Sequence, residues 1–502
     1  MPDDKLQAVM KFFDDEEAKI LKEAERLKAI QTALKLKDPK GTTSLLFQLG
    51  IKDTTPLEDE LEKLPPDLRA NIDTVEGNVV EMNFPLIKFT ELQKKAMGSG
   101  TANAMIVRLV VDHSKTFQTS FCCHLDNETK SEREYHYPWD QSASKKAHNG
   151  PIQQHCHGKM TPLTWQMTRI LHRYLKKGHP TLYYIHEHIQ ERLSQLPYHC
   201  IVCDLIHNGS QDPQLRRSTV CHSISCKQIW PKVPLHIRIP ELRSDPAVVD
   251  LILTTVYAAA MTARMDLLPN CPIRSTNTVL SILGTIPAVK VLQTTNALEQ
   301  RLALGHQDAE KLLTWACTTF RGFLTSAPSN LRIPGFGQHQ FLLANASPEI
   351  EAAFLMRRAI HHPDGSTGKV LFHGTPLERL PSILQQGLKI CSGTPLQRIG
   401  AAHGNGIYMA EDPATSYGYS STCHNSWQNS KFKNMRVLLG CEVVGPGNRV
   451  QSATGGVHLL KEEREVMIRY VFLMEQGAHT PPRQQVENVM ESAFWGLRRG
   501  TV

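Results

Sequence analysis

The chain has 502 residues, of which 41% are apolar and 21% charged. This is the balance of an ordinary globular protein, and it excludes collagen-like, wholly disordered and disulfide-miniprotein classes. At roughly 150 residues per domain, the length allows about three compact domains. Lysine plus arginine is 56 against 49 for aspartate plus glutamate, a net charge of +7. Because no basic run accompanies this charge, it gives nucleic-acid binding only weak support.

The first 17 residues are acidic and lack the charged-then-apolar order of a secretion signal. The most apolar stretch, 248–263, contains Asp250 and falls short of the roughly 18 residues that span a bilayer. We therefore expect an intracellular protein of the nucleus or cytoplasm, without a membrane span. Its twelve cysteines are then expected to be reduced thiols or metal ligands.

Residues 1–40 are predicted to form an N-terminal helix. The stretch 3–37 is rich in Ala, Leu, Lys and Glu and has no Gly or Pro until Pro39. Glutamates interrupt the second apolar stripe that a coiled coil needs, which favours a helix docked on its own protein over a dimer zipper. Self-association and the oligomeric state stay open. The heptad positions are Leu6, Phe13, Ile20, Leu27 and Leu34.

Residues 41–195 mix strand-like runs such as 105–111 with a helix-like segment at 163–177 and a polar loop at 127–159. This pattern indicates an α+β region whose fold the sequence does not identify. A cysteine-rich segment, 196–232, follows it. Residues 233–344 then show mostly helical apolar spacing, as in Val248, Leu251 and Ile252, which predicts a helical lead-in.

The cysteine-rich segment contains two pairs of thiols that could surround a zinc ion. Cys200 and Cys203 form C-x2-C, while Cys221 and Cys226 form the wider C-x4-C after a polar loop. The alternative is a set of buried free cysteines. A catalytic zinc is disfavoured because four closed ligands leave no open position. Three histidines could substitute for one thiolate: His199, His207 and His222.

From Lys369 the sequence reads KVLFHGTPLERLPSILQQGLKICSGTP, which predicts a short strand, a turn and a helix. Thr375 and Glu378 have the spacing of a capping box, Pro376 fits the first helical position and Gly387 ends the helix. His373 and its glycine neighbour therefore leave a strand end just before a helix. The expected buried stripe is Leu377, Leu380, Ile383 and Leu384.

A second motif follows about 35 residues later and reads GAAHGNGIYMAEDPATSYGYS. Gly404 and Gly406 precede a predicted strand at 407–409. Hydroxyl and aromatic side chains then gather on the turn or helix that follows, next to small residues. They are Ser416, Tyr417 and Tyr419.

The ordered series HGT, GIYMA and TSYGY resembles the catalytic domain of the poly(ADP-ribose) polymerase family. The resemblance implies an α+β fold: a C-terminal split antiparallel sheet domain, preceded by the helical and cysteine-rich regions. It places the catalytic core at 345–480 and leaves 481–502 as a tail. A looser resemblance, to members with a cysteine-rich segment and a helical region before the core, reaches back to about 196.

The resemblance also implies a pocket for NAD as a substrate. Gly374 would bind the nicotinamide amide through its backbone, with the Ser416 hydroxyl as the further partner. Tyr408 and Tyr419 would sandwich the ring, which suits a flat aromatic cation. His373 would hold the adenine-side ribose hydroxyls. Thr375, two residues further on, is also expected to bind NAD.

The family's third position decides which kind of transferase this is, and two registers compete for it. In the favoured one, Val457 begins a strand at 457–460, KEERE forms a charged turn, and 466–474 is the final strand. In the other, Glu465 takes the position, which leaves no further strand before Pro481. A valine cannot hydrogen-bond a ribose hydroxyl, so we expect chain elongation to fail. The pattern His373, Tyr408, Val457 is similar to the mono-ADP-ribosyltransferase branch.

The leading hypothesis is therefore an enzyme that transfers one ADP-ribose from NAD to a protein side chain, with automodification expected. The acceptor could be a carboxylate, a cysteine or a serine. The alternative from another class is a catalytically silent NAD or ADP-ribose binding scaffold. Modification of nucleic-acid ends is a third reading, favoured only if basic residues lie beside the pocket. Those residues are Arg169, Arg173, Lys176 and Lys177.

Overall fold

The computed structural model describes most of the chain beyond residue 55. The described ranges are 56–75, 79–112, 117–129, 135–136, 160–207, 216–295, 298–366, 368–391, 404–424, 426–450 and 456–502. The helix predicted over 1–40 and most of the polar loop predicted over 127–159 lie outside these residues. No helix in the described ranges is both long enough and apolar enough to cross a membrane.

The described part of 56–195 forms an N-terminal sheet unit. Its four strands form an antiparallel meander in the order β1-β2-β3-β4. They are β1 (Ile72–Val75), β2 (Val79–Pro85), β3 (Ala104–Asp112) and β4 (Phe117–Leu125). The strand run expected at 105–111 is therefore confirmed. The helices of the unit are α3 (Pro56–Glu62), α4 (Pro66–Arg69), α5 (Glu91–Met97), α7 (Pro162–Leu175) and α8 (Leu182–Gln195).

Helix α7 shows why this unit packs as it does. Thr161 and Thr164 form a capping box and Pro162 occupies the first turn, so the helix starts at Pro162, one residue before the predicted segment. Its buried side chains, together with those of α8, join the apolar residues of β2, β3 and β4 in one hydrophobic cluster. The helix-like segment predicted at 163–177 therefore covers the sheet and closes its core.

The cysteine segment, 196–232, connects this unit to a helical lead-in. It contains η3 (Leu196–Tyr198), α9 (Ile224–Ile229) and η4 (Trp230–Lys232). The lead-in is built around α12 (Pro246–Met261), which is buried nearly all round, as its continuous apolar sequence predicts. Its other elements are α10 (Leu235–Arg238), α11 (Glu241–Ser244), η5 (Met265–Leu267), α13 (Thr276–Thr285), α14 (Val289–Thr294), α15 (Leu298–Gly305) and α16 (Ala309–Thr318).

The C-terminal sheet unit, 323–502, holds an antiparallel sheet with the order β10-β11-β8-β7-β9-β12-β6-β5. The strands are β5 (Phe323–Ser326), β6 (His339–Asn345), β7 (Lys369–Thr375), β8 (Ile407–Ala410), β9 (Met435–Val443), β10 (Asn448–Val450), β11 (Val457–Leu460) and β12 (Val466–Glu475). The helices are η6 (Ser329–Leu331), α17 (Pro348–His361), η7 (Leu377–Arg379), α18 (Leu380–Gln386), α19 (Pro413–Tyr417), η8 (Glu463–Glu465) and α20 (Arg483–Arg499).

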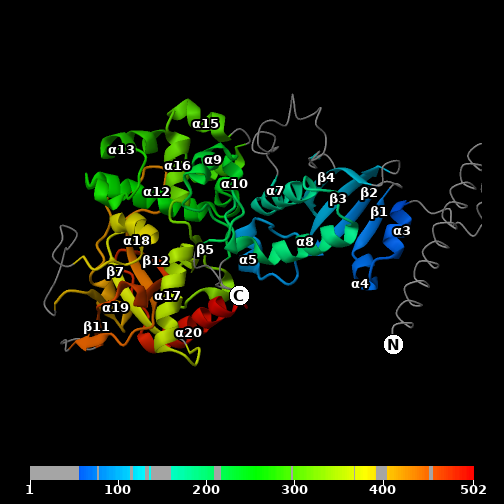
Figure 1. Ribbon diagram of the computed structural model, residues 1–502. Helices are drawn as coiled ribbons and strands as arrows, with labels where there is room; N and C mark the ends of the chain where they lie inside the picture. Colours follow the sequence, from blue (N-terminus) through cyan, green and yellow to red (C-terminus); the bar gives the residue numbers. More distant parts are fainter. Residues whose placement is uncertain are drawn as a thin grey trace, which may run out of the picture.

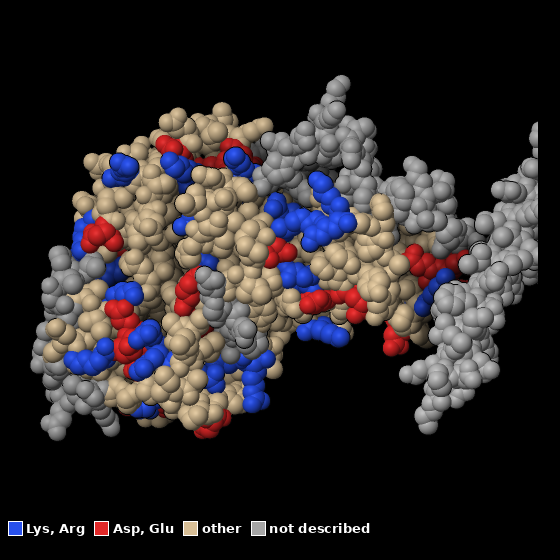
Figure 2. Space-filling view, viewed as in Figure 1, with Lys and Arg blue, Asp and Glu red and all other residues tan. Residues whose placement is uncertain are grey.

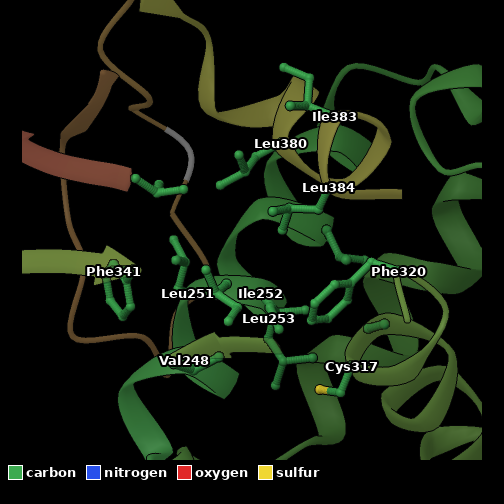
Figure 3. Packing of buried hydrophobic residues seen from close by; sticks show 14 of the residues in the cluster. Val248, Leu251, Ile252, Leu253, Cys317, Phe320, Phe341, Leu380, Ile383 and Leu384 are labelled. Carbon is green, nitrogen blue, oxygen red and sulfur yellow. The ribbon is translucent and has the colours of Figure 1, made fainter. Parts of the chain in front are cut away.

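Both faces of this sheet are covered, as the uninterrupted burial along β12 requires. On one face α20 packs Met490 and Phe494 against strand residues such as Phe472. On the other face lie α12 and α18, and Leu251, Leu384 and Phe341 of β6 belong to one buried hydrophobic cluster there (Figure 3). Figure 1 shows the N-terminal sheet unit to one side of this assembly, with α5 next to it, and Leu92 and Ala96 of α5 belong to a hydrophobic cluster with residues of the C-terminal sheet.

Two boundaries expected from the sequence differ from the structure. The region 233–344, expected to be a helical lead-in, ends with β5 and β6, which form the β5 edge of the C-terminal sheet. The region 481–502, expected to be a tail, contains α20, whose apolar side chains are buried against the sheet. The two motifs predicted the strands that carry them. Strands β5 and β6 and helix α20 contain no motif, so their place in the sheet unit was not predicted.

The helix expected after the first motif also begins differently. Thr375 is the last residue of β7, and the chain then makes a 3-10 turn from Pro376 before α18 starts. The capping box expected between Thr375 and Glu378 does not form, because Thr375 stays in the strand ladder opposite Val437. The end at Gly387, with φ 75°, and the buried stripe of Leu377, Leu380, Ile383 and Leu384 agree with the prediction.

Candidate functional site

The two sequence motifs meet where the C-terminal sheet splits. Strands β7 and β9 pair over seven residues, whereas β7 and β8 pair only at Phe372 and Ala410. Beyond that point the two strands diverge, and His373 bridges the gap. Its ring Nδ1 lies 2.9 Å from the carbonyl oxygen of Tyr408. The split therefore brings the histidine of the first motif to the tyrosine of the second.

The protonation state of His373 follows from this contact. The Tyr408 carbonyl can only accept, so Nδ1 carries the hydrogen and Nε2 is the acceptor of a neutral imidazole. Burial lowers the pKa of His373, and the nearby Arg379 lowers it further, against the opposing hydrogen bond to Tyr408. The ring is thus neutral at physiological pH and presents a hydrogen-bond acceptor.

Gly374 lies directly against the second motif. A Cβ at this position would overlap the carbonyl oxygen of Ser416 and would come 3.1 Å from the Ser420 hydroxyl. The Ser416 hydroxyl is buried and donates to the carbonyl of Phe372, 2.7 Å away. Glycine is therefore required here by close approach, and the short helix α19 packs on the end of β7.

The other predicted pocket residues differ in how far they are exposed to solvent. Tyr408 is half-buried, and its hydroxyl donates to the Gly404 carbonyl at 2.8 Å. Thr375 is buried. Tyr419 follows α19 with 58% of its surface exposed, so one predicted wall of the pocket is a solvent-facing ring.

One contributor that the sequence did not indicate is Arg436 of β9. Its guanidinium lies 3.9 Å from the centre of the Tyr417 ring and donates to the backbone carbonyls of Tyr417 and Ser420. These contacts hold the turn that carries Ser416 and Tyr419. The sequence signal for this residue is an arginine within an otherwise apolar strand. That signal does not indicate which turn the arginine side chain contacts.

The structure gives both registers of the third position a definite place. Val457 begins β11 and lies opposite Ala410 of β8, while Leu459 lies opposite Tyr408. Because paired residues share a face of the sheet, Val457 and Tyr408 project to the same side. Glu465 instead lies at the end of η8, where its carboxylate accepts from Arg357 and His361 of α17.

A polar network secures β11 beside the site. His458 is buried, and its Nε2 lies 2.8 Å from a carboxylate oxygen of Glu411, which also pairs with Arg483 of α20. The backbone N–H of Glu411 donates to the Gly456 carbonyl at 2.9 Å. The network involves the face of β11 opposite to Val457, so it positions the strand without contacting the Val457 side chain.

The four predicted thiol ligands come together in the cysteine segment. The sulfurs of Cys200 and Cys226 are 3.9 Å apart, those of Cys203 and Cys221 are 3.8 Å apart, and all four lie within 4.8 Å of one another. A tetrahedral zinc ion with Zn–S bonds of about 2.3 Å separates its sulfurs by about 3.8 Å. The residues therefore fit a structural zinc ion. Burial raises the pKa of Cys200 and Cys226, an effect that a bound cation would oppose.

The histidines considered as substitute ligands make other contacts. His199 Nδ1 lies 2.9 Å from the Gln195 carbonyl, and its Nε2 lies 2.8 Å from Arg192. His222 contacts Arg321 at 2.7 Å. The backbone N–H of His207 donates to the Tyr198 carbonyl at 2.9 Å, and burial lowers the pKa of its ring to about 4.

The basic residues considered for nucleic-acid binding lie on or just after α7, in the N-terminal sheet unit. Arg169 and Arg173 donate to the carbonyls of Val202 and Cys203. Figure 2 shows basic side chains gathered over α7, away from the elements that carry the two motifs (Figure 1). The group therefore does not lie beside the predicted pocket.

Comparisons with known proteins agree with the motifs. Residues 348–494 match the family model of the Poly(ADP-ribose) polymerase catalytic domain. The chain is 26% identical over 338 residues to Protein mono-ADP-ribosyltransferase PARP8 of Homo sapiens, a match that covers 58% of this chain and 39% of that protein. The Mus musculus protein of the same name matches to the same extent. The chain thus spans about two fifths of the length of these curated relatives, and the predicted resemblance and fold class are confirmed.

Proposed function

We propose that this protein is an NAD-dependent mono-ADP-ribosyltransferase that transfers one ADP-ribose to a protein side chain and releases nicotinamide. The observation that carries the proposal is the junction at the sheet split, where His373, Gly374, Tyr408 and Ser416 meet within the segment that matches the catalytic family. The mono-ADP-ribosyltransferase relatives support the same activity class. Protein acceptors, including the enzyme itself, are the proposed partners.

In this proposal the nicotinamide amide binds beside the contact between Gly374 and Ser416, to the backbone of Gly374 and to the hydroxyl of Ser416. The Ser416 hydroxyl donates to Phe372, so its lone pairs remain to accept from the amide N–H. Tyr408 and Tyr419 stack on the two faces of the pyridinium ring. The neutral His373 accepts from a ribose hydroxyl through Nε2, with Thr375 beside it.

The chemistry is cleavage of the bond between the nicotinamide nitrogen and the ribose carbon. The electron pair of that bond returns to the pyridinium nitrogen, and positive charge develops on the ribose as in glycoside hydrolysis. An acceptor carboxylate, thiolate or hydroxyl attacks this carbon, and a hydroxyl acceptor then loses its proton to solvent. Holding NAD in a reactive geometry supplies much of the rate enhancement.

Val457 limits the product to one unit. Its isopropyl group projects to the side of Tyr408 and offers neither donor nor acceptor to a second ribose. A glutamate at this place would accept from a ribose hydroxyl and orient an incoming ADP-ribose. We therefore propose that an ADP-ribose already attached to a protein is a poor acceptor for this enzyme.

The test is incubation of the full chain with labelled NAD, followed by separation under denaturing conditions. We expect one discrete labelled unit per modified site. Tyr408→Ala should abolish the label, because the ring loses its stacking partner. Glu465→Gln should retain the label per folded molecule, because that carboxylate binds Arg357 and His361.

Other outcomes separate the alternatives. A ladder of products that Glu465→Gln abolishes would assign the third position to Glu465 and make the protein a polymerase. If no label forms while NAD still raises the unfolding temperature, the protein is a binding scaffold. If no label forms and NAD does not raise the unfolding temperature, the predicted NAD pocket is refuted.

A further inference from the structure

We propose that Cys200, Cys203, Cys221 and Cys226 bind one zinc ion that joins the N-terminal sheet unit to the C-terminal sheet unit. The proposal does not depend on the proposed transferase activity. It rests on the arrangement of the four sulfurs and on what holds the backbone on each side of them.

The immediate surroundings of the sulfurs are those of a thiolate site. Three backbone N–H groups point at the sulfur of Cys200, from Val202 at 3.4 Å, Cys203 at 3.5 Å and Cys221 at 3.2 Å. Such donors stabilise negative charge on a sulfur. Two of the sulfur–sulfur separations, 3.8 and 3.9 Å, match the edges of a tetrahedral zinc site. With the three donors they favour a closed four-thiolate zinc site over four thiols in contact.

The first cysteine pair is attached to the N-terminal sheet unit. Arg169 of α7 donates to the Val202 carbonyl at 2.8 Å, and Arg173 donates to the Cys203 carbonyl at 3.0 Å. Arg192 of α8 pairs with Asp204, the residue that follows the second ligand. The turn between Cys200 and Cys203 is thus fixed by arginines from the two helices that cover the N-terminal sheet.

The approach to the second cysteine pair is attached to the C-terminal half. Arg321, just before β5, donates to the Val220 carbonyl at 2.8 Å and pairs with Glu349 of α17. Arg216 is fully buried; its backbone N–H donates to Asn345 at 3.1 Å, and its guanidinium donates to the Leu497 carbonyl of α20 at 3.0 Å.

Between these two attachments the segment has little regular structure of its own. Apart from bonds to sulfur, two hydrogen bonds connect the described halves, from Ile201 N to the Thr219 carbonyl at 3.0 Å and from the Ser218 hydroxyl to the Leu196 carbonyl at 2.9 Å. The four sulfurs connect the same halves, two ligands from each. The units also touch through α5, where Lys95 lies 2.7 Å from Asp245. A metal bound to the four sulfurs would add a second connection, from α7 to α20, and would contribute folding free energy there.

The test uses the full chain purified without added metal. Elemental mass spectrometry should find one zinc per chain in the wild type and in Cys271→Ser, a half-buried thiol outside the cluster. Cys203→Ser combined with Cys221→Ser should lose it; this pair is only partly buried, which limits the disturbance to the core. Hydrogen exchange should then quicken about tenfold or more in α7 and in 216–222, but not in the central strands β9 and β12.

Chelation of the wild type provides the matched measurement if the double variant does not fold. Removal of zinc should produce the same local increase in exchange, and returning zinc should reverse it. Absence of zinc, or two disulfides in its place, would overturn the metal site. Bound zinc whose removal leaves exchange in α7 and 216–222 unchanged would overturn the joining role.

Discussion

At the scale of single residues, the site depends on how closely two backbone segments approach. Gly374 touches the carbonyl of Ser416, and the Ser416 hydroxyl returns a bond to Phe372. The glycine of the first motif and the serine of the second are therefore required for packing as well as expected for binding. The same contact fixes α19 on the end of β7.

This packing leads to a prediction for Gly374→Ala. The added methyl group must push Ser416 and α19 away from β7, so we expect a loss of about 1–3 kcal/mol in unfolding free energy and weaker NAD binding. Gly284→Ala in α13 is the matched control, because nothing lies within 4 Å of its added Cβ; it should bind NAD normally and gain slightly in stability. Thermal unfolding with and without NAD measures both. Equal behaviour of the two variants would contradict the close approach.

At the scale of elements, the sequence could predict what local signals specify. The helix-like segment at 163–177, the apolar stripe of α18 and the strand at 457–460 all follow from short-range patterns, and the structure agrees. Thr375 did not cap a helix because its pairing opposite Val437 depends on a strand distant in sequence. The membership of β5, β6 and α20 in the C-terminal unit could not be predicted for the same reason: nothing local indicates which sheet a strand joins.

The helix α20 is also held by charges that no sequence pattern revealed. Arg498 lies 2.9 Å from Glu442 of β9, which in turn lies 3.3 Å from Arg469 of β12, and Arg469 pairs with Glu351 of α17 at 2.9 Å. All four side chains are at most 2% exposed. The cluster connects the helices on the sheet to its central strands, and each member compensates the buried charge of another.

Removing one member should therefore be costly. We expect Arg498→Ala to lose about 3–5 kcal/mol of unfolding free energy, because Glu442 keeps its buried charge with one partner fewer. Arg499→Ala, one residue along on the exposed side of α20, should change stability by less than about 0.5 kcal/mol. Chemical denaturation of the two variants gives the comparison. A small effect at Arg498 would show that water or Arg469 alone satisfies Glu442.

At the scale of the whole molecule, two histidines outside the candidate site have strongly lowered pKa values, the buried His207 and the half-buried His236. Burial lowers the pKa of His236 to about 4, with Arg243 and Arg238 lowering it further and Glu299 opposing them. Burial and Arg321 lower the pKa of His207 to about 4 as well, against Glu349. Both rings are thus neutral in the folded protein at pH values where an exposed histidine begins to take up a proton.

This arrangement predicts acid sensitivity above pH 4. The folded-state pKa of each ring lies below its unfolded value of about 6.5, so the unfolded chain binds the extra protons as pH falls between those values. Stability should therefore drop from about pH 6.5 to about pH 4, by up to about 1.4 kcal/mol per pH unit for each histidine. Unfolding free energy measured across this range should show a shallower slope for His236→Gln, which cannot be protonated. His424→Gln, at an exposed position, should keep the wild-type slope; if His236→Gln kept it too, that ring would not be held neutral by the fold.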